Sequence, residues 1–176
     1  MENVLAAFAK ITTLVFDVDG VLTDGTVQVL DTGEQVRTFN IKDGWAINRA
    51  VKEGLNVIII SAGNNEGVRK RLEYLGVKEI NLAVPNKLEL LDQYKKDLSL
   101  SDEQILYMGD DMPDYQVMQR VGLPTCPRDA ANDILNLAKY ISPKDGGKGA
   151  VRDVIEKILK IQDKWPKYEN IEGVNN

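Results

Sequence analysis

Short apolar runs alternate with amphipathic stretches along most of this chain, and that alternation limits its fold more than any other feature. The runs predict strands at 14–16, 57–60, 80–83, 105–108 and 123–126, with helices near 44–53, 66–75, 86–98, 113–120, 129–139 and 150–164. Such a repeat is typical of a mainly parallel sheet with helices on both faces and right-handed crossovers. The runs are continuously apolar, as expected of strands buried on both sides. We therefore predict an α/β fold with a doubly wound sheet.

One segment departs from this alternation soon after the first strand. Residues 26–30 and 35–39 resemble two strands joined by a turn that contains Gly33, which predicts a β-hairpin inserted over residues 25–40. A length of 176 residues suits one domain rather than two. We expect residues 1–165 to form that domain and the polar residues 166–176 to form a flexible tail.

The composition excludes several kinds of chemistry. The chain has no histidine and a single cysteine, Cys126, which rules out serine–histidine triads, histidine-ligated metals, multi-cysteine zinc sites and an internal disulfide. A net charge of -5 gives no basic surface for a nucleic-acid backbone. No run reaches the roughly 18 apolar residues of a membrane span, and the acid Glu2 argues against a secretory signal. We expect a cytoplasmic protein that binds neither nucleic acid nor membrane.

Polar side chains follow four of the predicted strands. They are Asp17 and Asp19 after the first, Ser61 after the second, Lys87 after the third, and Asp110, Asp111 and Asp114 after the fourth. Each alone could be a turn, a helix cap or a solvated residue. Because the carboxyl ends of parallel strands face one crevice, we expect these side chains to converge.

This set of side chains suits the hydrolysis of a phosphate ester. Phosphoryl transfer depends mainly on alignment of the attacking and leaving oxygens and on neutralising charge. Asp17 could attack as a carboxylate nucleophile, and Asp17 with Asp110 could bind Mg²⁺, which prefers oxygen ligands. Lys87 would add positive charge, Ser61 would bind a phosphoryl oxygen, and Asp19 would act as general acid and then base.

In order and spacing these residues resemble the four motifs of the haloacid dehalogenase superfamily. The matching segments are Asp17-Val18-Asp19-Gly20-Val21, Ser61, Lys87 and Gly109-Asp110-Asp111-Met112-Pro113-Asp114. The resemblance implies that Asp17 is both nucleophile and metal ligand and that Asp110 is a further ligand. It implies that Asp19 is the acid/base and offers its backbone carbonyl to Mg²⁺. Asp111 and Asp114 would lie just outside the metal's own ligands.

The gaps between these motifs leave no room for a cap domain, which many members of the superfamily insert there. Over residues 14–165 the chain resembles the cap-less family of 3-deoxy-D-manno-octulosonate 8-phosphate phosphatases. The resemblance is carried by Val21-Leu22-Thr23-Asp24-Gly25, Phe39-Asn40-Ile41-Lys42-Asp43-Gly44 and Gly146-Gly147-Lys148-Gly149-Ala150-Val151-Arg152. It implies a sugar acid phosphate as substrate, a role in lipopolysaccharide synthesis, and a homotetramer built on the hairpins.

The same resemblance implies contacts between protein and substrate. From the subunit's own chain these would be Asn40, Lys42, Asp43, Gly44 and Arg71. The glycine-rich segment formed by Gly146, Gly147, Lys148 and Gly149 would cover the site of a neighbouring subunit. Without the family argument, that segment could equally be a flexible connector before the last helix.

Two positions depart from the pattern of this family. Ser61-Ala62-Gly63 stands where Thr-Gly-Arg is usual, and Asn48 stands where an arginine often follows the Lys-Asp-Gly segment. The loss of both cations weakens the expectation that a substrate carboxylate binds in the usual way, because a charge-assisted hydrogen bond is roughly twice as strong as a neutral one. A nine-carbon keto-sugar acid phosphate or another small sugar phosphate is therefore an alternative substrate.

Two other classes of protein fit part of the pattern. A signalling receiver domain uses the same residue types but places its lysine last, whereas here Lys87 precedes Asp110. A non-catalytic, phosphatase-like regulatory or assembly domain is expected to lose at least one motif acid. Asp17, Asp19 and Asp110 are all retained, which favours an enzyme.

Overall fold

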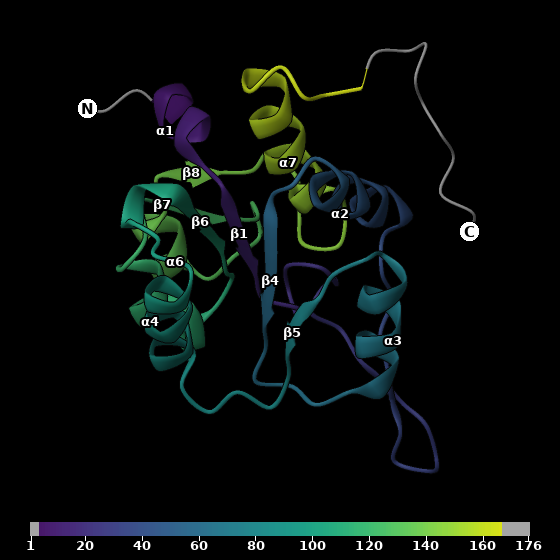
Figure 1. The fold of residues 1–176 in the computed structure, drawn as a ribbon. Coiled ribbons are helices and arrows are strands. Elements are labelled where there is room, and N and C mark those ends of the chain that lie inside the picture. Colours follow the sequence, from purple (N-terminus) through teal and green to yellow (C-terminus); the bar gives the residue numbers. More distant parts are fainter. Residues whose placement is uncertain (1–3, 167–176) are drawn as a thin grey trace.

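The computed structural model describes residues 4–166 and shows a six-stranded sheet between two layers of helices (Figure 1). The strands lie in the order β5 (Glu79–Asn81), β4 (Asn56–Ile60), β1 (Thr13–Phe16), β6 (Ile105–Met108), β7 (Leu123–Cys126) and β8 (Tyr140–Ile141), and neighbours are parallel. The chain runs from β1 outward to β5 and then returns to the other side of β1. This reversal is the switch point of a doubly wound sheet, so the predicted fold class is confirmed.

Helices cover both faces of the sheet and enclose two hydrophobic clusters. One cluster lies under α1 (Val4–Lys10), α2 (Ile41–Lys52), α3 (Glu66–Tyr74) and α7 (Ala150–Ile161). The other lies under α4 (Lys87–Asp97), α5 (Tyr115–Met118) and α6 (Asn132–Leu137). Neighbouring strand residues point to opposite clusters, as Leu14 and Val15 do. The continuous apolar run of β1 is therefore buried on both faces, as its sequence predicts.

The observed elements differ from the predicted ones mainly at their ends. The hairpin is present, but β2 (Gln28–Val29) and β3 (Gln35–Val36) pair over two residues each, because both strands are exposed and have no core to extend them. The predicted helix near 113–120 begins as a 3₁₀ turn (Met112–Asp114) before α5, and a second 3₁₀ turn covers Asp102–Gln104.

Two short elements, α1 and β8, were not predicted from the sequence. The predicted tail lies outside the described residues except for Pro166. Within residues 4–166, no helix combines the length and apolar character needed to span a membrane.

The segment before α7 packs tightly on the loop that follows β1. Gly146 and Gly147 are buried, and the Gly147 N–H donates to the carbonyl of Val21 at 3.0 Å. A Cβ at position 146 would lie 1.9 Å from the carbonyl oxygen of Gly20, so only glycine fits there. The segment is therefore a fixed part of the fold and not a flexible connector.

We predict that Gly146→Ala destabilises the protein by about 3 kcal/mol, since the new methyl group meets backbone that cannot move without shifting the β1 loop. Gly54→Ala is the matched control, because Gly54 has a positive φ of 80° but open space around its Cα. That change should cost about 1 kcal/mol of backbone strain. Urea unfolding of both variants measures the difference, and an equal loss at the two positions would contradict the close packing.

Candidate active site

The centre of the sheet brings the acidic motif residues together at its carboxyl edge. Asp17 directly follows β1, and its N–H donates to the carbonyl of Met108, the last residue of β6, at 3.1 Å. Ser61 directly follows β4 on the other side of β1. One carboxylate oxygen from each of Asp17, Asp110 and Asp114 lies within 4.8 Å of the others. Strand order thus places residues almost 100 positions apart at one point.

Lys87 is the cation at the centre of this group. It is the first residue of α4, whose N-terminus is capped by the side chain of Asn86. Its Nζ lies 2.8 Å from Asp17 Oδ2 and 2.7 Å from Asp114 Oδ1, and its side chain is 5% exposed. Burial acts to lower the pKa of Lys87, but the two carboxylates outweigh it and raise the pKa above its usual value. The ammonium group therefore stays charged.

Asp114 organises its neighbours and has little capacity left for a ligand. Its Oδ1 accepts hydrogen bonds from Lys87 and from the Tyr107 hydroxyl, each at 2.7 Å, and its Oδ2 accepts from the Asp110 N–H at 3.2 Å. The side chain is fully buried. Asp114 thus fixes Lys87 and the backbone of Asp110, although its carboxylate lies close enough to belong to a metal cluster. Tyr107 was missed because it reads as an apolar residue within β6.

The remaining carboxylates, Asp17 and Asp110, fit a hard divalent cation. Burial, followed by the negative charge of Asp114, raises the pKa of Asp17 to about 7. Burial, followed by the charge of Asp17, raises the pKa of Asp110 to about 7 as well. A Cβ on Gly20, whose φ is 77°, would overlap the Asp110 carboxylate at 1.9 Å, so glycine allows this close approach. Excess negative charge on oxygen donors is the environment that Mg²⁺ prefers.

Asp19 and Ser61 lie beside this centre. The Ser61 side chain is buried, and its Oγ accepts from the N–H of Gly63 at 3.1 Å, which leaves the hydroxyl hydrogen free to donate. Asp19 forms a bidentate ion pair with Arg37, a hairpin residue that we did not predict to be functional. No local pattern in the sequence marks this pair, because its partners are 18 residues apart on different elements. Asp111 is exposed and caps the following 3₁₀ turn through the N–H of Met112.

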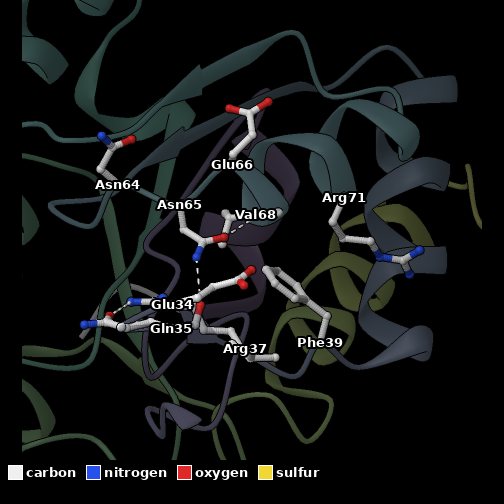
Figure 2. A pocket seen from close by; sticks show the side chains of 12 residues that line it. Glu34, Gln35, Arg37, Phe39, Asn64, Asn65, Glu66, Val68 and Arg71 are labelled. Atoms are coloured by element: carbon white, nitrogen blue, oxygen red, sulfur yellow. Dashed lines mark hydrogen bonds between the residues drawn. The ribbon is translucent and has the colours of Figure 1, made fainter. Parts of the chain in front are cut away.

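The residues that we expect to touch substrate are divided among several places. Arg71 and residues of the hairpin, among them Arg37, the partner of Asp19, line a pocket of about 740 Å³ (Figure 2). Gly44 lies against the Arg71 side chain, since a Cβ at position 44 would be 2.8 Å from Arg71 Nη2. Lys42 is exposed in a separate groove that also contains Lys148 and Gly149. Of the expected substrate contacts, Arg71 is therefore the one that lines the pocket containing Arg37.

Asp43, an expected substrate contact, caps a helix in the structure. Its side chain is buried, with 1% exposure, and it accepts hydrogen bonds from the N–H groups of Gly149 at 3.1 Å and Arg152 at 2.7 Å. These are donors at the N-terminus of α7 that would otherwise be unpaired. Burial raises the pKa of Asp43 despite these bonds. The sequence pattern alone could not separate a capping acid from a binding one.

The glycine-rich segment packs on its own subunit. Asn40 caps α2 through the N–H of Lys42, and its Nδ2 donates to the carbonyl of Gly147 at 3.1 Å. Lys148 pairs with Asp24 of the same chain at 3.3 Å. These contacts and the buried Gly146 hold the segment on its own subunit, and its contact with a neighbouring site stays a prediction.

We predict that Asp43→Ala lowers the free energy of unfolding by about 1 to 3 kcal/mol, because it leaves two N–H groups of α7 without an acceptor. The KM of the folded variant should stay within about twofold of the unchanged protein, since a cap makes no contact with substrate. Chemical unfolding and steady-state kinetics measure the two effects. A large rise in KM at unchanged stability would restore the substrate-contact assignment.

We predict that Mg²⁺ affinity falls as the pH drops below about 7, because Asp17 and Asp110 then carry protons that binding must displace. Titration calorimetry in two buffers of different ionisation enthalpy should show proton release near neutral pH and little above about pH 8.5. Asp110→Asn should weaken binding, whereas Asp133→Asn, an exposed change on α6, should not. An affinity independent of pH over this range would contradict the charge arrangement.

Comparison with known proteins agrees with this geometry. Residues 78–155 match the family model for haloacid dehalogenase-like hydrolases. The 3-deoxy-D-manno-octulosonate 8-phosphate phosphatase of Escherichia coli K12 is 35% identical over 162 residues, which cover 92% of this chain and 86% of that protein.

Solved structures give the same result. The phosphatase of that name from Yersinia pestis has a TM-score of 0.89 at 34% identity, over 93% of this chain and 88% of its own. The phosphatase from Moraxella catarrhalis, solved with a magnesium ion, a phosphate ion and KDO, has a TM-score of 0.89 at 29% identity, over 94% and 95%. With relatives of this identity along most of both chains, the protein belongs to the haloacid dehalogenase-like hydrolases, in the family of 3-deoxy-D-manno-octulosonate 8-phosphate phosphatases.

Proposed function

We propose that this protein is a Mg²⁺-dependent phosphatase that hydrolyses 3-deoxy-D-manno-octulosonate 8-phosphate to the free sugar acid and phosphate. The observation that carries the proposal is the grouping of Asp17, Lys87 and Asp110 at the carboxyl edge of β1 and β6. The names of the relatives support the substrate, and the ligands of the Moraxella catarrhalis structure support both the metal and the product.

In the proposed reaction Asp17 is the nucleophile. Its Oδ1 accepts from the N–H of Val18 at 2.7 Å and its Oδ2 faces Lys87, so the carboxylate is held in one orientation. Attack on phosphorus forms an aspartyl-phosphate and breaks the bond to the sugar oxygen. Asp19 protonates that oxygen and then removes a proton from the water that releases phosphate.

Neighbouring groups would hold the transferring phosphoryl group during both steps. The free hydroxyl hydrogen of Ser61 can donate to one phosphoryl oxygen, and the Lys87 ammonium neutralises part of its charge. Asp17, Asp110 and the backbone carbonyl of Asp19 would hold Mg²⁺, which would neutralise further negative charge between the nucleophile and the phosphate. Asp111 and Asp114 would act through these ligands, Asp114 by orienting Lys87.

The active form is proposed to be a homotetramer joined through the hairpins. The hairpin exposes several large apolar side chains that a monomer would leave in water: Val27, Val29, Leu30 and Val36, of which Val29 is 64% exposed. Exposed apolar side chains gathered on one small element are typical of an interface between subunits. A neighbouring subunit could also narrow a site that has no cap domain of its own.

We predict that Asp17→Asn reduces turnover at least a hundredfold without loss of stability, because the amide cannot attack phosphorus and removes one buried charge. Asp97→Asn, an exposed change on α4, serves as the control. Phosphate release is measured with eight-carbon and nine-carbon keto-sugar acid phosphates and a neutral sugar phosphate, each with Mg²⁺ and with EDTA.

Preference for the eight-carbon acid, lost with EDTA, is the expected result. Preference for the nine-carbon acid would keep the mechanism and replace the substrate, an outcome to which Gly63 and Asn48 give some weight. No release from any ester would favour a regulatory or assembly role, and Asp17→Asn activity above a few per cent would remove Asp17 from the mechanism.

A further inference from the structure

Arg37, an arginine of the hairpin, forms an ion pair with Asp19, the proposed acid/base residue. Arg37 lies just after β3, and its side chain is 10% exposed. Its Nε donates to Asp19 Oδ1 at 2.6 Å and its Nη2 to Asp19 Oδ2 at 3.1 Å. The hydrogen bond to Asp19 is the main cause of a raised pKa for Arg37, so the guanidinium is charged. A bidentate pair of this kind is among the strongest side-chain contacts in proteins.

The contact is built into the fold on the hairpin side as well. Asn65, the N-cap of α3, accepts from the N–H of Val68 at 3.0 Å and donates through Nδ2 to the carbonyl of Gln35 at 2.9 Å, a bond drawn in Figure 2. The Gln35 side chain in turn accepts from Arg37 Nη2 at 3.4 Å. The base of the hairpin is thereby fixed to α3, which places the Arg37 guanidinium over the active site.

This ion pair conflicts with the acid/base role expected of Asp19. An acid/base residue must come within hydrogen-bond distance of the leaving oxygen of the substrate. In the structure both oxygens of Asp19 accept hydrogen bonds from Arg37, so this pair competes with a hydrogen bond from Asp19 to an ester held at Asp17. The pair must therefore loosen when substrate is bound, and only a group that binds Arg37 better in the loosened state can drive that change.

The surroundings of Arg37 show where such a group would sit. Arg37 and Arg71 line the same pocket of about 740 Å³, together with Phe39, Asn64 and Asn65 (Figure 2). This volume suits a small organic ligand. Glu34 and Glu66 also line the pocket, but both are exposed and can face water. Arg37, which pairs with Asp19, is therefore the cation of this pocket that can bind an anion beside the active site.

Gly63 lies between Asp19, Ser61 and Arg37 and leaves room for the Arg37 guanidinium. A Cβ at position 63 would lie 3.4 Å from Asp19 Oδ2, 3.5 Å from Ser61 Oγ and 3.8 Å from Arg37 Nη2. A longer side chain there would compete with Arg37 for the space between phosphate site and pocket. With glycine at this position, that space is open to the guanidinium of Arg37.

From this geometry we infer that Arg37 determines specificity for sugar acids and couples their recognition to catalysis. The carboxylate of a sugar acid phosphate, bound in the pocket, takes hydrogen bonds from Arg37 and so frees Asp19 to turn toward the ester. A neutral sugar phosphate has no group that can displace Asp19. The inference rests on the proposed phosphatase function. It adds that Arg37 binds the carboxylate of the substrate, which is remote from phosphorus.

The test compares Arg37→Gln and Arg37→Lys with the unchanged protein on three substrates. They are a keto-sugar acid phosphate, a neutral sugar phosphate of similar size, and p-nitrophenyl phosphate, whose leaving group needs no proton from Asp19. Arg120→Gln, which removes an exposed arginine after α5, is the charge-matched control. Thermal unfolding of each variant checks the fold.

Arg37→Gln should lower the ratio of kcat/KM for the acid to that for the neutral sugar phosphate about ten- to hundredfold, as expected for a lost bond to a charged group. The loss should appear mainly as a higher KM for the acid. Hydrolysis of p-nitrophenyl phosphate should not fall, because this substrate has no carboxylate for Arg37 to bind. Arg37→Lys should keep much of the preference for the acid, because a lysine still attracts a carboxylate, although without the bidentate fit.

Several outcomes would overturn the inference. An unchanged ratio in Arg37→Gln, or an equal loss on all three substrates, would make Arg37 a purely structural partner of Asp19. If Arg37→Gln does not fold, Arg37→Lys decides. An equal loss of activity by Arg37→Lys on the acid and on p-nitrophenyl phosphate would also refute the inference. If the wild-type protein is active but does not prefer sugar acid phosphates, the inference is refuted and the proposed function stands. No activity on any substrate refutes the proposed function and the inference together.

Discussion

The like charge gathered at the carboxyl edge of β1 is the constraint to which the rest of the site responds. Asp17, Asp110 and Asp114 offer oxygens within 4.8 Å of one another, in surroundings that raise the pKa of the first two to about 7. Lys87 is the buried cation that holds Asp17 and Asp114 together. Its charge offsets only part of the repulsion, and the remainder is what a divalent cation would neutralise. Charge imbalance in the free protein is therefore the source of metal affinity.

Placing such a group requires a scaffold that does not yield to the repulsion. The parallel strands β4, β1 and β6 supply it, since they are buried on both faces and hydrogen-bonded along their length. The Asp17 carboxylate begins one residue beyond this rigid segment. Asp114 is fixed from below by the Tyr107 hydroxyl, which belongs to the neighbouring strand. Burial opposes the ionisation of these carboxyl groups, and hydrogen bonds from the strands of the rigid sheet offset part of that cost.

The sheet and the convergence of Asp17, Lys87 and Asp110 could be anticipated, because both follow from local apolar runs and from the geometry of parallel strands. The pairing of Arg37 with Asp19 could not, since it joins a loop to an exposed hairpin without any repeating pattern. The capping role of Asp43 could not be anticipated either. Its place in a recognised segment suggested a ligand contact, whereas it bonds to N–H groups more than 100 residues away. Contacts of that separation depend on tertiary packing, which periodicity does not encode.

The close fit of Gly146 against Gly20 also bears on the order in which the protein matures. The loop carrying the nucleophile leaves the ribosome before the segment that packs against its backbone, which lies about 125 residues further along the chain. During synthesis the acidic cluster therefore exists as sequence well before it exists as a site. A nascent chain stalled before this segment has emerged contains every motif acid but lacks the packing that holds the Asp17 loop in shape.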